Sequence, residues 1–128
     1  MLRTCWENYF DVGDEDTVLK FAKSIGTKNQ LHLDNQIARQ NGRLGIVVPG
    51  VMIIGFADAT ITEEVGEVEV RRLEIDFVGH LYAGSLVSVL CTVLYKKMSI
   101  AKIAVTVKNG FQTIAEGSCF LMLARKSA

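Results

Sequence analysis

The chain has 128 residues, which is enough for one compact domain and too few for two ordinary ones. Its 14 Lys and Arg residues balance 14 Asp and Glu residues, so the sequence lacks the basic excess that is typical of a nucleic-acid-binding protein. With 49% hydrophobic residues, 22% charged residues and a single proline, the composition excludes an intrinsically disordered chain.

The cysteines and the apolar segments indicate the compartment. Cys5, Cys91 and Cys119 show no C-x-x-C spacing, which argues against a disulfide framework and against a thiolate zinc site. The opening residues contain no apolar signal segment, and the longest apolar run, residues 46–57, is shorter than the ~20 residues that span a bilayer. We therefore expect a cytoplasmic protein with no metal and no cofactor that binds neither nucleic acid nor membrane.

Two short helices are expected in the first third of the chain. Apolar residues near helical spacing predict the first, with Asp16 or Thr17 as its N-cap and Gly26 as its stop. A polar loop follows, and a second brief helical pattern covers residues 35–40.

A third helix is predicted after Pro49 and Gly50. The stretch that follows, residues 51–59, is apolar on every side, and its Met, Ala and Gly content favours a helix over a strand. A helix of this composition is expected to have protein all around it.

The second half of the chain alternates with the period of two that is typical of strands. A phase slip at Arg71 and Arg72 predicts a bulge in the first of them. Strands are then expected over residues 85–95, 100–108 and 111–123, and the Asn109-Gly110 pair predicts a type I′ hairpin turn between the last two. These strands form an antiparallel meander.

The predicted fold class is α+β, with the antiparallel sheet curling around the apolar helix. The strand from Ser85 to Leu94 carries apolar residues on both of its faces. Because a domain this small cannot bury both faces by itself, we expect a homodimer or a larger even assembly.

His32 is the first candidate for chemistry. It lies in a dense polar segment, residues 27–34, and an imidazole exchanges protons near neutral pH. Asp34 is a candidate to orient the ring. The alternative is a histidine with no catalytic role, and the spacing alone does not decide between the two.

The start of the apolar helix is the second candidate. Backbone N–H groups in a first helical turn lack intrahelical partners and lie at the positive end of the helix dipole. Gly50 has no Cβ, so a ligand can approach these groups closely, and such an end polarises a carbonyl oxygen as an oxyanion hole does. The alternative is that Pro49 and Gly50 simply begin a helix.

Together the two segments resemble a known family. Residues 29–34 (NQLHLD), Ala38 and residues 45–52 (GIVVPGVM) are similar to the signature of the MaoC-like hydratases and dehydratases of acyl thioesters, and residues 77–84 (FVGHLYAG) are similar to a later turn of that family. The resemblance implies one hot-dog domain over residues 1–128, with a central helix wrapped by an antiparallel sheet, paired subunits, and an acyl-CoA or acyl-carrier-protein thioester as substrate.

The resemblance also implies the site residues and their roles. His32, Asn29, Thr27 and Gly50 are the expected catalytic residues, and the turn of Pro49, Gly50 and Val51 is expected to bind the substrate. The family has an aspartate where this chain has Thr27, and a threonine hydroxyl holds a water but does not ionise near neutral pH. A hydratase that is weakened by this loss is the function that the resemblance implies.

Two alternatives stay open from the sequence. The chain could be a non-catalytic thioester-binding subunit that pairs with an active homologue, or an acyl-thioester hydrolase on the same fold. Asp58 is the only charge in the apolar stretch and is expected at a subunit interface rather than in the site. His80 is expected to be a solvated turn residue, since no further metal ligands cluster around it in the sequence.

Overall fold

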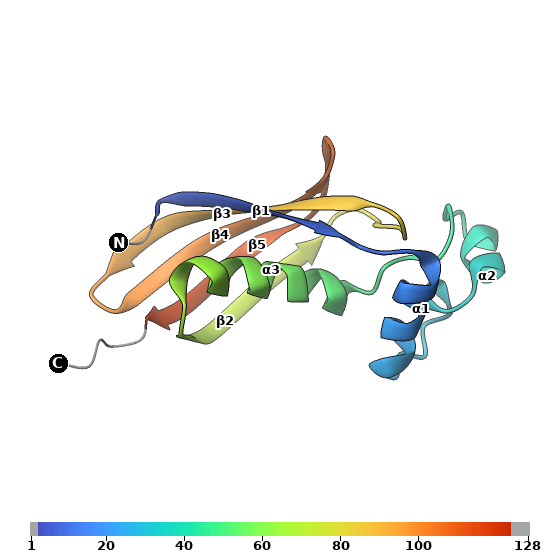
Figure 1. Cartoon of the computed structure of the whole chain (residues 1–128), viewed down its shortest axis with the longest axis horizontal. Helices are drawn as coiled ribbons and strands as arrows, with labels where there is room; N and C mark the ends of the chain where they lie inside the picture. The colour runs from blue at the N-terminus through green and yellow to red at the C-terminus, as the bar shows by residue number, and fades with distance from the viewer. Residues whose placement is uncertain (1–2, 124–128) are drawn as a thin grey trace.

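The computed structural model describes residues 3–123, and it contains one antiparallel sheet and one long helix (Figure 1). The sheet has five strands in the order β1-β3-β4-β5-β2, so β3, β4 and β5 form the expected meander, whereas β2 pairs with β5 and not with β3, contrary to the prediction. Their bounds are Cys5–Asp11 (β1), Val68–Phe77 (β2), Leu86–Lys97 (β3), Ile100–Asn109 (β4) and Gln112–Leu123 (β5). The helices are α1 (Glu15–Ser24), α2 (Asn35–Gln40) and α3 (Gly50–Val65), with a 3-10 turn η1 at Gln30–His32.

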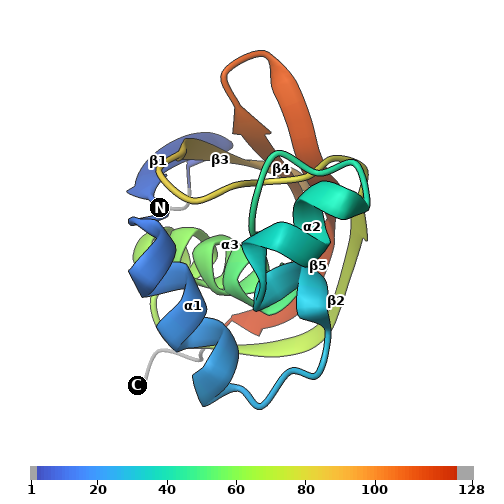
Figure 2. The same ribbon diagram turned by 90° about the vertical axis from the view of Figure 1, so that its right-hand side faces the viewer.

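The sheet curves around α3, and the core fills the space between them (Figure 2). Ile53, Ala57 and Ile61 share one side of α3 because they are four residues apart, and all three are buried. They pack with the inward-facing residues of the strands, among them Val87, Val89, Ile103, Val105, Ile114 and Leu121. The predicted α+β arrangement of a sheet wrapped around a central helix is confirmed.

The predicted complete burial of this helix is wrong. Val51 is 56% exposed, and Gly55, Asp58 and Ala59 are exposed as well. The sheet covers only one side of α3, and the apolar composition of the stretch does not show which side is left without a neighbour.

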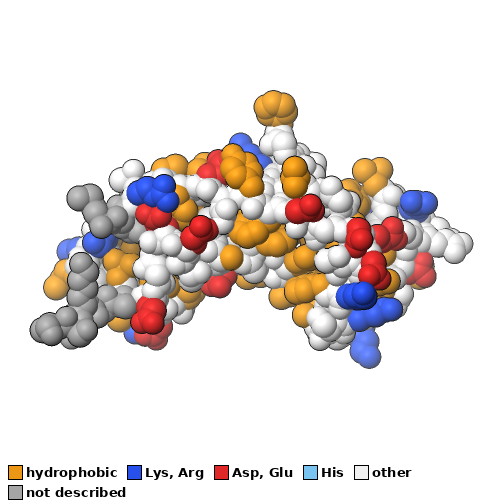
Figure 3. All heavy atoms as spheres, viewed as in Figure 1, with side chains coloured by type: hydrophobic (Ala, Val, Ile, Leu, Met, Phe, Trp, Pro, Cys, Tyr) orange, Lys and Arg blue, Asp and Glu red, His pale blue; other side chains and the backbone are white. Residues whose placement is uncertain are grey.

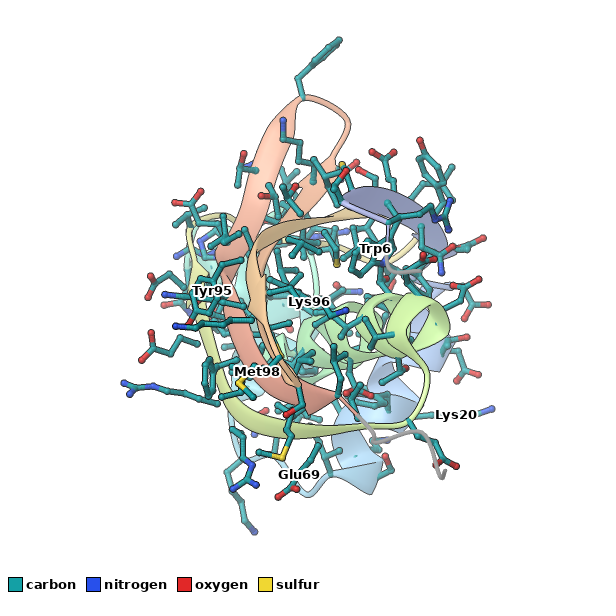
Figure 4. The ribbon with its side chains drawn as sticks, turned by 90° about the vertical axis from the view of Figure 1, so that its left-hand side faces the viewer. Trp6, Lys20, Glu69, Tyr95, Lys96 and Met98 are labelled. Atoms are coloured by element: carbon teal, nitrogen blue, oxygen red, sulfur yellow. The ribbon has the colours of Figure 1, made fainter. Side chains whose placement is uncertain are left out.

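The first strand, β1, is absent from the sequence prediction. It pairs antiparallel with β3, with Trp6 opposite Cys91, and so forms one edge of the sheet. The Trp6 side chain lies against α3, and its indole N–H donates to the carbonyl oxygen of Thr60 at 2.8 Å (Figure 4). This bond joins the edge strand to the central helix.

The other edge strand, β2, carries the predicted bulge. Its register with β5 shifts between Val70 and Arg72, at the phase slip in the sequence. The hairpin between β4 and β5 is also present, but its turn type differs from the prediction. Gly110 has a φ of 60° whereas Asn109 and Phe111 do not have positive φ, a pattern of type II′ rather than type I′. Figure 3 shows a hydrophobic side chain projecting at the hairpin tip, where Phe111 is fully exposed.

The short helices agree with the sequence except for one cap. The helix α2 has the predicted bounds. The helix α1 begins at Glu15, and its N-cap is Asp14 rather than Asp16 or Thr17, because the Asp14 carboxylate accepts a hydrogen bond from the Thr17 N–H at 2.8 Å. Among residues 3–123, no helix has the length and apolar character needed to cross a membrane.

Candidate functional site

A cavity of about 370 Å³ opens at the start of α3. Four segments that are distant in the sequence meet there: η1, the loop before α3, the first turns of α3, and the chain that leaves β2. The residues that line the cavity are His32, Val47, Val48, Gly50, Ile53, Phe77, Val78, Gly79, His80 and Leu81. Within the described chain the lining is apolar except for the two imidazoles, and it includes no carboxylate.

A backbone carbonyl fixes the ring of His32. The Nδ1 atom lies 2.6 Å from the Val47 carbonyl oxygen. Because a carbonyl oxygen only accepts, Nδ1 carries the proton and donates it, which leaves the lone pair of the neutral ring on Nε2. The N–H of Val47 in turn donates to the Leu31 oxygen at 2.9 Å, so the His32 turn and the Val47 segment hold each other in place. This arrangement supplies a proton acceptor at the cavity.

Val47 therefore takes the orienting role for which Asp34 was the candidate. The Asp34 carboxylate instead caps α2, where it accepts hydrogen bonds from the N–H groups of Gln36 at 2.8 Å and Ile37 at 3.1 Å. The residue is used to begin a helix, a common role for an aspartate at this position.

Thr27 and Asn29 shape the loop that carries His32. The Asn29 side-chain oxygen accepts from the Leu31 N–H at 3.0 Å, and the Asn29 N–H donates to the Thr27 hydroxyl at 3.2 Å. Neither residue belongs to the lining, and Asn29 is exposed. In this conformation both side chains hold the turn; their catalytic roles remain predictions.

The start of α3 lies at the cavity through Gly50. Pro49 is the N-cap and makes no side-chain capping bond, so within residues 3–123 the start of the first turn keeps N–H groups without a partner at the positive end of the helix dipole. A Cβ on Gly50 would lie 2.8 Å from Cζ of Phe77, whose ring packs against the glycine. Of the three predicted substrate-binding residues, Gly50 lines the cavity, whereas Pro49 is buried and Val51 faces outward.

His80 is the lining residue that sequence reasoning set aside. It is exposed, as expected of a turn residue, but the turn lies at the cavity. The signal in the sequence was that His80 is the only other histidine of the chain and falls in the segment that resembles the family turn. Its proximity to the His32 site depends on the packing of β2 and could not be inferred from local pattern.

The comparisons with known proteins identify the fold. No protein-family model matches the chain, and a search of curated proteins found no significant match. Among solved structures, the ChsH1–ChsH2 complex from Mycobacterium tuberculosis matches with a TM-score of 0.87 and 16% identity, over 97% of this chain and 98% of that chain. The unliganded R-hydratase PhaJ1 from Pseudomonas aeruginosa matches with a TM-score of 0.86 and 18% identity, over 98% of this chain and 83% of that chain.

A thioesterase shares the same fold. A variant of the fluoroacetyl-CoA-specific thioesterase FlK matches with a TM-score of 0.71 and 10% identity, over 97% of this chain and 87% of that chain. At these identities the likeness shows the fold and not the reaction. The hot-dog fold that was expected from the resemblance to the MaoC-like family is confirmed.

Proposed function

We propose that this protein is a hydro-lyase that adds water to a trans-2-enoyl thioester and, in reverse, dehydrates a 3-hydroxyacyl thioester. The observation that carries the proposal is that a fixed imidazole, His32, and the first turn of α3, at Gly50, line one apolar cavity. Acid–base groups and a preorganised dipole are the two elements that this reaction needs.

The reaction follows from the two groups. The thioester carbonyl oxygen is bound at the Gly50 N–H, where the helix dipole stabilises the negative charge that develops on it. Water attacks C3, the Nε2 atom of His32 accepts a proton from that water, and C2 receives a proton. The apolar lining lowers the local dielectric constant, which strengthens both electrostatic interactions.

Thr27 is proposed to reduce the rate. Its hydroxyl takes the place of a carboxylate in the resembling family and here accepts a hydrogen bond from Asn29. A general acid–base group is typically worth ~10²–10⁴ in rate, so its loss slows the reaction by about that factor without abolishing it. Asn29 is proposed to act by holding the turn of His32, and Pro49 and Val51 by setting the direction in which α3 starts.

Enoyl-CoA thioesters of short and medium chain length test the proposal. Loss of the conjugated double bond, followed by absorbance, is the expected result, while a thiol reagent shows whether free coenzyme A is released instead. Release of thiol without hydration would replace this proposal with thioester hydrolysis, the reaction class of the thioesterase FlK, which shares this fold.

A matched variant tests the role of His32. In His32→Asn the side-chain amide N–H keeps a donor near the position of Nδ1 for the Val47 oxygen, while the basic Nε2 is lost. The variant is expected to melt at the wild-type temperature and to lose activity ~10²–10⁴-fold. Thr27→Asp is the converse change and is expected to raise the rate. Wild-type activity in His32→Asn would refute the assignment.

The absence of a carboxylate from the lining favours one second candidate. The chain would then be the thioester-binding subunit of a mixed dimer; the ChsH1–ChsH2 structure of this fold is likewise a complex of two different proteins. That function predicts no turnover by the pure chain and turnover only with a partner subunit.

A homodimer is the proposed assembly. Among the described strands β2 pairs only with β5, so its outer edge is open. Val51, Phe77 and Val78, next to this edge and to the cavity, are each about half exposed. Burying them against a second copy would remove apolar surface from water. A monomer in size-exclusion chromatography with light scattering would refute this.

A cytoplasmic location is proposed from the cysteines. Cys5, Cys91 and Cys119 are all free thiols, the state that a reducing compartment maintains.

A further inference from the structure

Both histidines of the chain line the same cavity. His32 comes from η1 and His80 from the segment between β2 and β3. The proposed mechanism uses His32 as a base and leaves His80 without a role. The remaining lining residues are aliphatic, aromatic or glycine, so within the described chain these two imidazoles are the only side chains of the lining that can transfer a proton.

The backbone on both sides of His80 is fixed. On one side the Gly79 N–H donates to the Ile114 oxygen at 3.1 Å, and on the other the Leu81 oxygen accepts from the Val48 N–H at 2.8 Å. A Cβ on Gly79 would lie 2.8 Å from the Thr113 carbonyl oxygen, so the segment packs closely on the start of β5. Hydrogen bonds to β5 and to the segment before α3 therefore position the backbone on both sides of His80 at the cavity.

Two consecutive residues, Val47 and Val48, bond to the segments that carry the two histidines. Val47 accepts the Nδ1–H of His32, and Val48, the next residue, is bonded to Leu81, which follows His80. An isolated bridge between Val47 and Tyr82 extends this pairing. The segment of Val47 and Val48, which ends two residues before Gly50, therefore contacts both His32 and the backbone next to His80.

The two rings differ in what they can do. His32 donates one N–H to the Val47 oxygen, and its other nitrogen is left to accept a proton. His80 makes no side-chain hydrogen bond with any residue of the described chain, so both of its nitrogens are available, and when protonated it is a donor at either one. Hydration of an enoyl thioester consumes one proton acceptor and one proton donor.

We propose that His80 is the general acid of this cavity, the group that delivers the proton to C2 of the thioester; this rests on the proposed hydration. In the step, the C3–O bond forms and one O–H bond of water breaks, with that proton passing to Nε2 of His32. The π electrons of the C2–C3 double bond form the new C2–H bond with the proton of the His80 imidazolium. Solvent then removes the proton from His32 and returns one to His80, so one water is consumed in total.

Among the described residues that line the cavity, His80 meets no carboxylate, Lys or Arg side chain. Within residues 3–123, η1 contributes His32 to the lining, α3 contributes its positive N-terminal end, and β2 contributes the uncharged ring of Phe77. His32 must be neutral and His80 protonated for the step to occur.

The test measures kcat and KM of three chains with a trans-2-enoyl-CoA. His80→Gln keeps a polar side chain without an ionisable ring and is expected to lose kcat at least tenfold. Glu116→Gln, which neutralises an exposed charge on β5 away from the lining, is the control and is expected to keep the wild-type kcat and KM. Melting temperatures of the variants show that each is folded.

The outcomes separate this inference from the proposed function. A wild-type chain that hydrates no enoyl thioester overturns both. A wild-type chain that is active, with His80→Gln keeping its kcat, overturns only the role of His80. A change in KM alone also overturns that role, because it shows that His80 binds the substrate without transferring a proton.

Discussion

Replacing Gly117 with alanine tests how the edge strand β2 is held. Gly117 lies in β5, where it pairs with Ile75 of β2 and Val105 of β4. A Cβ at this position would overlap the Glu74 carbonyl oxygen and lie 2.8 Å from the Glu74 carbonyl carbon and 2.9 Å from the Ile75 Cα. All three are backbone atoms of a paired strand, so no side-chain rotation relieves the overlap.

The cost follows from the identity of those atoms. Overpacking of a well-packed site reduces the free energy of unfolding by about 1–3 kcal/mol. Because the atoms in the way belong to the backbone of β2, we expect the loss in Gly117→Ala to be near the upper end of this range. A loss of ~3 kcal/mol lowers the ratio of folded to unfolded chains about 100-fold. Because β2 runs into Phe77 and the lining segment, the displacement is also expected to change the cavity and reduce turnover.

Urea denaturation at fixed protein concentration measures this loss. Trp6 is the only tryptophan and is buried against α3, so its fluorescence reports unfolding. Gly55→Ala is the matched control: a Cβ there meets no atom within 4 Å, and alanine in a helix is favoured over glycine by up to ~1 kcal/mol. A Gly117→Ala chain as stable as the wild type would refute the close approach of β2 and β5.

Two further predictions use the thiols and the first helix cap. Burial raises the pKa of the Cys91 thiol to about 12 and also raises the pKa of the Cys119 thiol, whereas Cys5 is exposed. A thiol reagent at mildly alkaline pH is therefore expected to modify one thiol per native chain quickly and all three after unfolding. Fast modification of two thiols in the native chain would contradict the packing. The Thr17 N–H and hydroxyl lower the pKa of the Asp14 carboxyl, so Asp14→Ala is expected to reduce the melting temperature at neutral pH. Because the pKa of the Asp14 carboxyl is lower in the folded state, this stabilisation is present above the unfolded pKa of ~3.9 and is lost as pH falls through the folded pKa. The difference in melting temperature between variant and wild type should therefore disappear below about pH 4. A difference that stays constant with pH would count against the cap.

The sequence predicted the features that a few neighbouring residues determine. Pro49 and Gly50 begin α3 because a proline fixes φ and a glycine follows it. The phase slip at Arg71 appears as a bulge because a change of side-chain period in a strand requires an extra residue. The hairpin at Gly110 forms because the glycine accepts a positive φ.

The errors concern residues whose state depends on a distant partner. The strand β1 was missed because it exists by pairing with β3, 75 to 87 positions away, and not by a pattern of its own. The open side of α3 was missed because an apolar sequence does not state which of its residues meet the sheet. The N-cap of α1 is a local exception, because Asp14, Asp16 and Thr17 are all capping residue types and only the contact of Asp14 with the Thr17 N–H distinguishes them.

The sequence by itself determined the period of each segment, the start of the central helix, and a histidine and a helix start of the kind that thioester chemistry uses. Only the tertiary structure decided that His32, Gly50 and His80 share one apolar cavity, and that Thr27 and Asn29 hold a turn beside it. The physical reason is that periodicity and turn chemistry act over a few residues, whereas the lining of a cavity is set by strand pairing and packing between segments that are far apart in the chain.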